Sequence, residues 1–233
     1  QSLPRGPLAL VHEQLVDEAA GGGRVRAGGG ASLPVVARRT VAEGLAGMEW
    51  AVGVPGSMGG AVRMNAGGHG SDMSTVLVSA STVDLTTGVC RTRAVDELSL
   101  GYRRSSVDGN EVVVSVELGL PIGDRAAGEA RLAEVVRWRR ANQPGGQNAG
   151  SVFVNPVPGE VTCGALIDSA GLRGFRHGSA TVSEKHANFI QADENGSADD
   201  VRALMRLVRD RVEAASGWRL RSEIRLIGFE DDF

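Results

Sequence analysis

The segment VGVPGSMGGAVRMNAGGHG, residues 52–70, contains seven glycines and one proline and carries almost no charge. Because glycine costs about 1 kcal/mol per helical position, we do not expect an ordinary helix here. Glycine permits positive φ and close approach of the backbone to a ligand, and consecutive bare N–H groups attract anions. The segment therefore predicts a loop that wraps a phosphate-bearing cofactor. A tight surface loop is the alternative, but the apolar flanks and the position of Asn65 among small residues favour the cofactor loop.

Two common nucleotide-binding motifs are absent from this segment. Residues 56–60, GSMGG, are not followed by Lys and Ser or Thr, so they do not form a P-loop. No strand–GxGxxG–helix unit with an acidic residue about 20 positions further on is present, which excludes the dinucleotide-binding fingerprint of doubly wound folds. Any cofactor must therefore be held in another way.

The composition is typical of a soluble globular protein, with 233 residues, 42% hydrophobic and 23% charged. A net charge of −3 indicates no general attraction to nucleic acid or to anionic membranes. Cys90 and Cys163 lie far apart without metal-like spacing, so we expect free thiols and a cytoplasmic location. No apolar run reaches transmembrane length, and the first residues do not resemble a signal peptide. We expect small-molecule partners only, no metal, no nucleic acid, no membrane, and a monomer.

Strands and helices occur in mixed order, which predicts an α+β fold rather than a doubly wound sheet. The expected strands are 8–12, 24–28, 76–85, 89–93, 111–120, 180–182, 187–192 and 221–229, and residues 151–155 are expected to form a short strand or a turn. The expected helices are 32–44, 129–141, 163–170 and 198–216, with an irregular loop at 142–150. Residues 121–128 are polar and contain glycine, so we place a domain boundary there and expect domains at 1–125 and 126–233.

Five segments carry a family resemblance when they are taken together and in order. They are GMEWAVGVPGSMGGAVRMNAGGHG (47–70), GYRRS (101–105), NAGSVFVNP (148–156), SEKHANFI (183–190) and SEIRLIGF (222–229). They resemble the MurB family of UDP-N-acetylenolpyruvoylglucosamine reductases, and the joint match is far more specific than any one segment. The resemblance implies an α+β chain with part of an FAD-binding domain of the PCMH or vanillyl-alcohol-oxidase type. A smaller MurB C-terminal substrate-binding domain would follow, with its last strand returning to the active site.

The activity implied is the reduction of UDP-N-acetylenolpyruvoylglucosamine, a UDP-sugar enolpyruvyl ether, to UDP-N-acetylmuramate in peptidoglycan synthesis. NADPH would reduce FAD, and the reduced flavin would pass hydride to the enolpyruvyl methylene carbon. The residues that match cofactor-binding positions of the family are Gly53, Val54, Pro55, Gly56, Ser57, Gly59, Gly60, Ala61, Asn65, Ala66, Gly67 and Arg225.

Three residues match the catalytic positions of the family, although each has an ordinary interpretation when it is taken alone. Arg103 would be a surface ion-pair partner, Ser151 a turn hydroxyl and Glu223 an outward-facing strand carboxylate. The resemblance implies instead that Arg103 binds the substrate carboxylate, that Ser151 protonates the substrate carbon, and that Glu223 helps to orient that centre. The residues that match substrate contacts are Tyr102, Asn155 and, as a weak contact, Lys185.

Two departures from the family pattern bear on these expectations. Val154 stands where the family often carries lysine, so a charged contact is not expected from this position. The sequence begins after the upstream GGGSN-like phosphate loop of the family, and residues 28–30 match a later turn instead. The sequence is therefore either part of a longer chain or a shortened relative, and in the second case we expect weak FAD binding.

Two other functions are compatible with the residues. One is a relative without flavin that binds nucleotide sugars and does not catalyse, and the other is a flavin oxidase that uses oxygen. A flavin absorption spectrum would exclude the first, and rapid bleaching by NADPH would favour the reductase over the oxidase.

Overall fold

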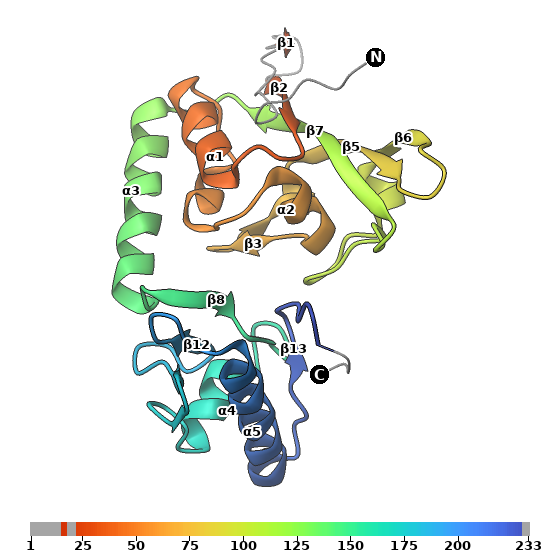
Figure 1. Ribbon diagram of the computed structural model, residues 1–233. Coiled ribbons are helices and arrows are strands. Elements are labelled where there is room, and N and C mark those ends of the chain that lie inside the picture. Colours follow the sequence, from red (N-terminus) through yellow and green to blue (C-terminus); the bar gives the residue numbers. More distant parts are fainter. Residues whose placement is uncertain (1–14, 18–21, 230–233) are drawn as a thin grey trace. The chain divides into compact units, whose positions relative to one another are not determined.

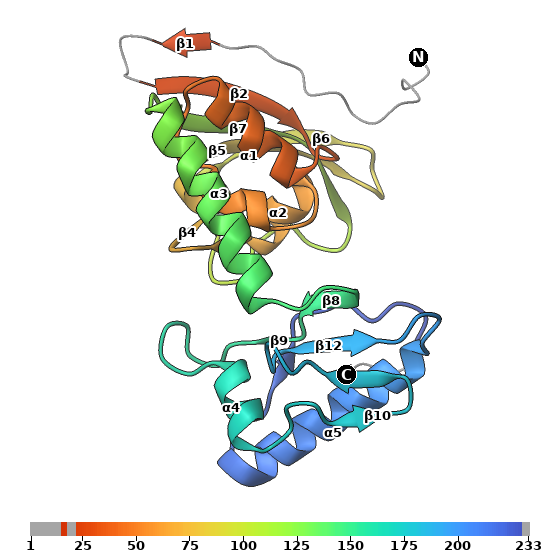
Figure 2. The same ribbon diagram turned by 90° about the vertical axis from the view of Figure 1, so that its left-hand side faces the viewer.

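The computed structural model describes residues 15–17 and 22–229, and the chain divides into two compact units, residues 1–139 and 140–233 (Figure 1, Figure 2). Each unit has antiparallel strands, helices and an apolar core of its own. This combination confirms the predicted α+β class. The strand expected at residues 8–12 lies outside the described residues.

The first unit is built on a five-stranded antiparallel sheet with the order β1-β2-β7-β5-β6. Its strands are β1 (Leu15–Asp17), β2 (Gly22–Gly28), β5 (Leu77–Asp84), β6 (Cys90–Ala94) and β7 (Glu111–Pro121). The strands expected between residues 24 and 120 are therefore confirmed. The longest strand, β7, lies at the centre because it pairs with β2 on one side and with β5 on the other.

A β-bulge in β7 determines which of its side chains face the core. The register against β5 shifts between Ser81 and Thr82, which leaves Val114 as an extra residue in β7. Val113 and Val116 are consequently both buried although they are three positions apart. From Val116 onward the ordinary alternation of buried and less buried residues resumes.

Helices α1 (Leu33–Ala42) and α2 (Met58–Met64) lie on one face of this sheet (Figure 1, Figure 2). Their apolar side chains share one buried cluster with those of β2, β5 and β7. As predicted, α1 starts after Ser32 with a proline in its first turn, and Gly44 with φ +73° follows its end. The remaining short elements are η2 (Glu49–Gly53), β3 (Gly67–Gly68), β4 (Ser71–Asp72), η3 (Met73–Thr75) and η4 (Val95–Leu98).

Helix α2 corrects the expectation that the glycine-rich segment contains no ordinary helix. Tertiary packing offsets the low helix propensity of its two glycines. The N–H of Gly59 donates a hydrogen bond to the carbonyl oxygen of Gly29 at 2.7 Å, and a Cβ atom at Gly59 would lie 3.1 Å from the carbonyl oxygens of Gly29 and Val113. Glycine is therefore what lets α2 lie directly on the backbone of β7.

Gly29 is the second glycine of this contact, and it is still more tightly enclosed. A Cβ atom at Gly29 would overlap the carbonyl oxygen of Val113. The N–H of Gly29 donates to the carbonyl oxygen of Val114 at 2.8 Å, which fixes this close approach. The turn at residues 28–30 is thus pressed between β7 and α2, where only a residue without a side chain fits.

The boundary between the units lies at residues 139 and 140, not at 125 and 126 as expected from composition. Helix α3 (Arg125–Asn142) follows the polar segment but packs onto the first unit. Val135 is fully buried in the core of that unit, and Gly128 faces Val41 of α1 so closely that a Cβ atom would lie 2.8 Å from it. These contacts assign most of α3 to the first unit, which composition alone does not indicate.

The second unit combines a four-stranded antiparallel sheet, order β10-β11-β12-β8, with two helices and a short β9–β13 pair. As predicted, Ser197 caps the long helix α5 (Ala198–Ser216), and its Oγ accepts a hydrogen bond from the N–H of Asp199 at 3.1 Å. Helix α4 (Cys163–Ser169) is also confirmed. The strands are β8 (Gln147–Ser151), β9 (Phe153–Val154), β10 (Arg176–His177), β11 (Ala180–Val182), β12 (Phe189–Ala192) and β13 (Arg221–Ser222).

Two expectations for the second unit are corrected. The last strand covers only β13, since its partner β9 is itself two residues long and Ile227 beyond it is 90% exposed. Residues 147–150, expected to be irregular, are part of strand β8, which pairs with β12. Glycine and asparagine conceal this strand in the sequence, and pairing with a buried neighbour stabilises it.

Candidate active site

The glycine-rich segment presents uncovered backbone on both sides of α2. At Gly56, Gly68 and Gly70, no atom of the described residues lies within 4 Å of a Cβ position, apart from the immediate chain neighbours. At Gly60 a Cβ atom would meet only the Oγ of Ser57, at 3.4 Å. These peptide groups are therefore accessible to a bound ligand, which is what a glycine cradle for a flavin nucleotide requires.

A buried donor without a partner lies just before this segment. Trp50 in η2 is 4% exposed, and within the described part of the chain its Nε1 has no hydrogen-bond partner. Buried polar atoms are nearly always hydrogen-bonded, so such a donor fits a site that receives an acceptor from a bound group or a water. The uncovered glycines and this indole together fit a bound FAD.

Asn65 organises the second half of the segment. It is 3% exposed and has left-handed backbone at the end of α2, with φ +40°. Its Oδ1 accepts from the N–H of Ser74 at 3.0 Å, and its Nδ2 donates to Asp72 Oδ2 at 3.1 Å and to the carbonyl oxygen of Gly101 at 3.2 Å. Both amide hydrogens are thus used inside the unit, and the side chain shapes the loop rather than facing out of it.

Of the predicted cofactor-binding positions, some are buried in the unit and others are accessible. The buried ones are Gly59, Ala61 and Asn65, and the exposed ones are Pro55, Gly56 and Gly60. Intermediate exposure is found at Gly53, Val54, Ser57, Ala66 and Gly67. A ligand can therefore contact the segment mainly through its exposed backbone, while the buried residues hold the shape.

The structure brings Arg103 to the glycine-rich segment. Arg103 lies in a turn closed by two hydrogen bonds between Gly101 and Arg104, of 3.0 and 3.1 Å, and its φ is +54°. Its Nη2 donates to the carbonyl oxygen of Gly67 at 3.2 Å. The neighbouring ring of Tyr102 is 40% exposed, and the guanidinium carbon of Arg103 lies 5.1 Å from its centroid. The predicted carboxylate ligand thus sits beside the predicted cofactor loop.

In the second unit, Ser151 and Glu223 lie on neighbouring chain segments. Ser151 is the last residue of β8, and the residue after it, Val152, accepts a hydrogen bond from the N–H of Glu223 at 2.8 Å. Ser222 of β13 is paired with Phe153 of β9, which fixes this register. The two predicted catalytic residues of this unit are therefore brought together, whereas Arg103 belongs to the first unit.

Asn188, which the sequence did not single out, holds the chain beside Ser151. It is 4% exposed, its Oδ1 accepts from the N–H of Phe153 at 3.0 Å, and its Nδ2 donates to the carbonyl oxygen of Phe153 at 2.8 Å. Its own carbonyl accepts from the N–H of Val152 at 2.9 Å. The backbone and the side chain of Asn188 thus hold Val152 and Phe153, the two residues that follow Ser151. The signal was its place within the segment 183–190.

Asn155 and Cys163 connect the end of β9, which follows Ser151, to the start of α4. Asn155 Oδ1 accepts from the N–H of Cys163 at 2.9 Å, and Cys163 Sγ donates to the carbonyl oxygen of Val154 at 3.1 Å. Burial, with a further contribution from the charge of Glu223, raises the pKa of Cys163 to about 12. The thiol therefore stays protonated at neutral pH and is not a nucleophile. The side-chain Oδ1 of Asn155, the predicted substrate ligand, thus accepts from the first N–H of helix α4.

The remaining candidates in the second unit differ in their surroundings. Lys185 is exposed, and its Nζ donates to the carbonyl oxygen of Arg140. Burial lowers the pKa of His186, whose ring packs edge-on against Phe189 with centroids 4.9 Å apart. Arg225 is exposed beyond β13. His186 thus has the character of a core residue rather than a proton shuttle.

Two further observations concern the described residues as a whole. Within residues 15–17 and 22–229, no helix combines the length and the apolar character needed to cross a bilayer. Among the same residues, no group of three or more His, Cys, Asp or Glu side chains could hold a metal ion.

Two family models match the chain. A model of the FAD binding domain matches residues 9–93, and a model of the UDP-N-acetylenolpyruvoylglucosamine reductase C-terminal domain matches residues 142–227. The two matches fall in the first and the second unit, respectively.

Relatives of known name agree with these models. The chain is 45% identical over 207 residues to the UDP-N-acetylenolpyruvoylglucosamine reductase of Heliobacterium modesticaldum, covering 88% of this chain and 65% of the relative. It is 43% identical over 226 residues to reductase 2 of Symbiobacterium thermophilum, covering 96% and 72%. The crystal structure of the reductase (MurB) from Thermus caldophilus matches with a TM-score of 0.77 and 34% identity, covering 86% of this chain and 71% of that one. The chain thus spans about two thirds of the length of such relatives.

Proposed function

The chain belongs to the UDP-N-acetylenolpyruvoylglucosamine reductase family, and we propose that it carries out the reaction of that family. The reaction is the FAD- and NADPH-dependent reduction of UDP-N-acetylenolpyruvoylglucosamine to UDP-N-acetylmuramate, an oxidoreductase step of peptidoglycan synthesis. The observation that carries the proposal is the hydrogen bond from Arg103 Nη2 to Gly67, which places a permanent positive charge beside an open glycine cradle.

FAD fits the first unit through the uncovered backbone at Gly56, Gly60 and Gly68 and the unpartnered donor of Trp50. When bound, FAD supplies the redox chemistry, since it takes a hydride from NADPH and passes one to the methylene carbon of the enolpyruvyl group. The protein has to place the substrate and to handle the charge and the proton. Its polar side chains perform these tasks.

Arg103 binds and orients the enolpyruvyl carboxylate. A guanidinium keeps its charge at any physiological pH and presents paired donors to the two oxygens of a carboxylate. Negative charge develops on the carbon next to the carboxylate and on the carboxylate itself during the reaction. A fixed cation at this position stabilises that charge more in the transition state than in the ground state, which raises the rate.

Ser151 donates the proton to the carbon that carries the carboxylate, and Glu223 positions that centre. Ser151 is half-buried at the end of β8, where pairing with β12 and the Asn188 amide hold the backbone. Glu223 is fixed by its own N–H to Val152, directly after the serine. A positioned donor of this kind contributes about 10²- to 10⁴-fold to a rate.

We propose small-molecule partners for the chain, namely the UDP-sugar enolpyruvyl ether and NADPH, with contacts from Tyr102, Asn155 and Lys185. We also propose a cytoplasmic monomer that binds neither nucleic acid nor membrane. Both cysteines are free thiols, which supports the cytoplasmic location. The net charge of −3 supports the absence of nucleic-acid and membrane partners.

The test is the absorption spectrum of the purified protein followed through both half-reactions. We expect a flavin spectrum that NADPH bleaches and that the enolpyruvyl substrate restores under anaerobic conditions. Absence of flavin together with binding of the UDP-sugar would favour the non-catalytic relative. A reduced flavin that oxygen reoxidises and the substrate does not would favour the oxidase.

A further inference from the structure

The turn that carries Arg103 lies in a long connection, residues 95–110, between β6 and β7. Beyond η4 this connection is neither helix nor strand, and Ser99 and Arg103 have left-handed backbone with φ +46° and +54°. Such conformations are unfavourable for non-glycine residues and persist only where the surroundings impose them. The position of Arg103 therefore depends on what holds the connection.

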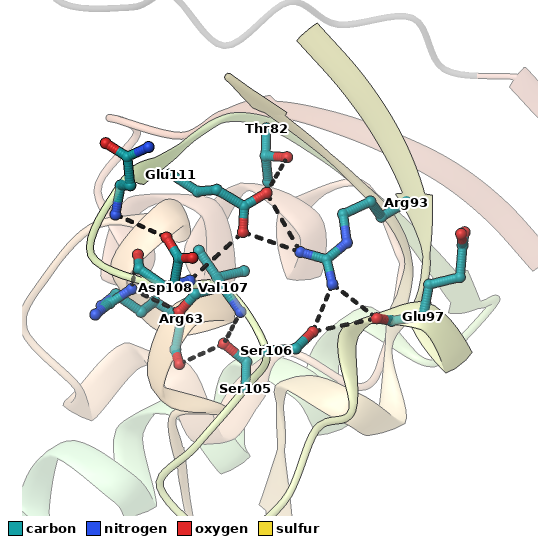
Figure 3. Close-up of polar contacts among 10 residues, drawn as sticks. Arg63, Thr82, Arg93, Glu97, Ser105, Ser106, Val107, Asp108 and Glu111 are labelled. Carbon is teal, nitrogen blue, oxygen red and sulfur yellow. Dashed lines mark hydrogen bonds and ion pairs between the residues drawn. The ribbon is translucent and has the colours of Figure 1, made fainter. Parts of the chain in front are cut away.

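Arg63, in the last turn of α2, forms a two-way link with this connection (Figure 3). Its Nη1 donates to the carbonyl oxygen of Val107 at 2.6 Å and also to that of Asp108. In the other direction, Ser105 Oγ donates to the backbone carbonyl oxygen of Arg63 at 2.7 Å, and the N–H of Val107 donates to Ser105 Oγ at 3.2 Å. Arg63 of α2 thus binds the connection through both its side chain and its backbone.

The sheet holds the same connection through Arg93 of β6. Arg93 forms an ion pair with Glu111 at 3.1 Å, and its Nη2 donates to the carbonyl oxygen of Glu97 at 2.8 Å and to Ser106 Oγ. Both members of the ion pair are 18% exposed, so they are partly shielded from solvent. Arg93 anchors the connection to the sheet, whereas Arg63 ties it to helix α2 of the glycine-rich segment.

The bonds from Arg63 satisfy backbone carbonyl groups of the connection that have no place in a helix or strand. The carbonyl groups of Val107 and Asp108 lie outside regular structure, and Val107 is only 4% exposed. Carbonyls that no helix or strand pairs need donors, and Arg63 supplies a charged one through one part-buried and one exposed hydrogen bond, which is stronger than a bond from a neutral donor. Asn65, two residues further, adds a bond to Gly101 at 3.2 Å. Both ends of the Arg103 turn are therefore tied to the end of α2.

We propose that Arg63 is a positioning residue for Arg103. It fixes residues 101–108 onto α2, so that the guanidinium of Arg103 stays beside Gly67 and the cofactor segment. The proposal rests on the proposed role of Arg103 in binding the substrate carboxylate.

The experiment compares Arg63→Ala, Arg63→Lys, Arg103→Ala and the Arg63→Ala/Arg103→Ala double variant in the flavin-loaded protein. Arg24→Ala is the matched control, because Arg24 forms an exposed ion pair with Glu117 on the same sheet, away from the connection. Stopped-flow absorbance measures flavin reduction by NADPH and reoxidation by substrate separately. Amide hydrogen exchange of residues 101–110 is measured on the same variants without substrate.

We expect Arg63→Ala to slow reoxidation by about 10- to 100-fold, as for a misplaced catalytic group, and to leave the NADPH step near wild type. Exchange should rise in residues 101–110 and not in β2 or β7. Arg63→Lys should recover part of the rate, since an ammonium can also donate to two carbonyls. The double variant should be no slower than Arg103→Ala, because Arg63 acts only through Arg103.

Three results would overturn the inference while the proposed role of Arg103 stands. The first is a wild-type rate of reoxidation with wild-type hydrogen exchange in Arg63→Ala. The second is a loss of reoxidation rate in the double variant that equals the sum of the two single losses. The third is faster exchange throughout the first unit together with slowing of both half-reactions. If Arg103→Ala itself reoxidises at the wild-type rate, the proposed role of Arg103 is wrong, and the inference fails with it.

Discussion

Arg103 in the first unit and Ser151 in the second are both held in place by side chains that bond to backbone, but the two devices differ in depth. Around Arg103, the guanidinium of Arg63 binds carbonyl groups of a connection that is partly exposed. Beside Ser151, the amide of Asn188 binds the N–H and the carbonyl oxygen of Phe153 within the core. The first device is at the surface of its unit and the second is inside it.

The difference teaches how function and stability are connected in each unit. When a buried amide is removed, its two hydrogen bonds to the backbone are lost where water cannot replace them. When a guanidinium near the surface is removed, water can solvate the freed carbonyls, and the main loss is positional. Stability and catalysis should therefore change together around Ser151 and separately around Arg103.

The largest expected effect comes from Asn188→Ala. A hydrogen bond contributes about 0.5–1.5 kcal/mol net, so the loss of both bonds to Phe153 in the core should lower the free energy of unfolding by up to about 3 kcal/mol. Denaturant titration of the full chain measures this, with hydrogen exchange of residues 140–229 as the signal for the second unit. Asn148→Ala is the control, because Asn148 is exposed on β8 and should cost less than about 1 kcal/mol. Equal losses in the two variants would remove the distinction between the two devices.

The second prediction concerns the hydroxyl of Ser151 itself, apart from the contacts that hold its backbone. Ser151→Ala removes one hydroxyl from a half-buried position, so the fold and the flavin spectrum should survive. Reoxidation by substrate should fall by about 10² or more, while NADPH bleaches the flavin at close to the wild-type rate. Ser151→Cys should recover part of the loss, since a thiol also donates a proton. Slower bleaching with unchanged reoxidation would show that the hydroxyl has another role.

The third prediction tests the separation of stability from binding within the first unit, using two adjacent glycines. Gly59→Ala should destabilise the unit by about 1–3 kcal/mol, because its Cβ atom would lie 3.1 Å from two carbonyl oxygens. Gly60→Ala should leave stability unchanged or slightly higher, because that Cβ atom meets only Ser57. FAD content per folded protein should nevertheless fall in Gly60→Ala. Wild-type flavin content in that variant would show that this face of α2 is not part of the cradle.

The smallest expected effect is a pH dependence of the second unit. Burial lowers the pKa of His186 below 6.5, with a smaller contribution from the charge of Arg173, so the folded chain binds this proton more weakly than the unfolded chain. The free energy of unfolding should therefore decrease as the pH falls through 6.5 towards the folded pKa. His186→Gln should reduce this dependence in denaturant titrations, and His177→Gln, at an exposed position, should not. The same slope in both variants would exclude His186 as its source.

Much of the fold could be predicted because local signals agreed with the tertiary contacts. The apolar alternation of β7, the turn between β5 and β6 and the serine cap of α5 each specify their element without outside help. Helix α2 and strand β8 could not be predicted in this way. Their glycines weaken the local preference, and contacts with distant strands decide the outcome.

The candidate catalytic residues followed from the family resemblance, but their supports did not. Arg63 and Asn188 act through carbonyl and N–H groups far away in the sequence, and no spacing rule connects them to those partners. Their location in segments 47–70 and 183–190 was the only sequence signal. The placement of α3 also depended on contacts. Val135 packs into the core of the first unit, so the polar stretch before it does not mark the domain boundary.

The contact between Gly29 and β7 predicts an unusual profile in a saturation scan of this chain. At most positions, the tolerance to substitution is graded by size or polarity. At Gly29 the first carbon of any side chain would already overlap the carbonyl oxygen of Val113, so the smallest replacement should fail as completely as the largest. We therefore expect every substitution at Gly29 to abolish folding, whereas substitutions at Gly60 should be tolerated according to size. Such a difference would show, from sequence variants alone, that the backbone of Gly29 is in direct contact with that of β7.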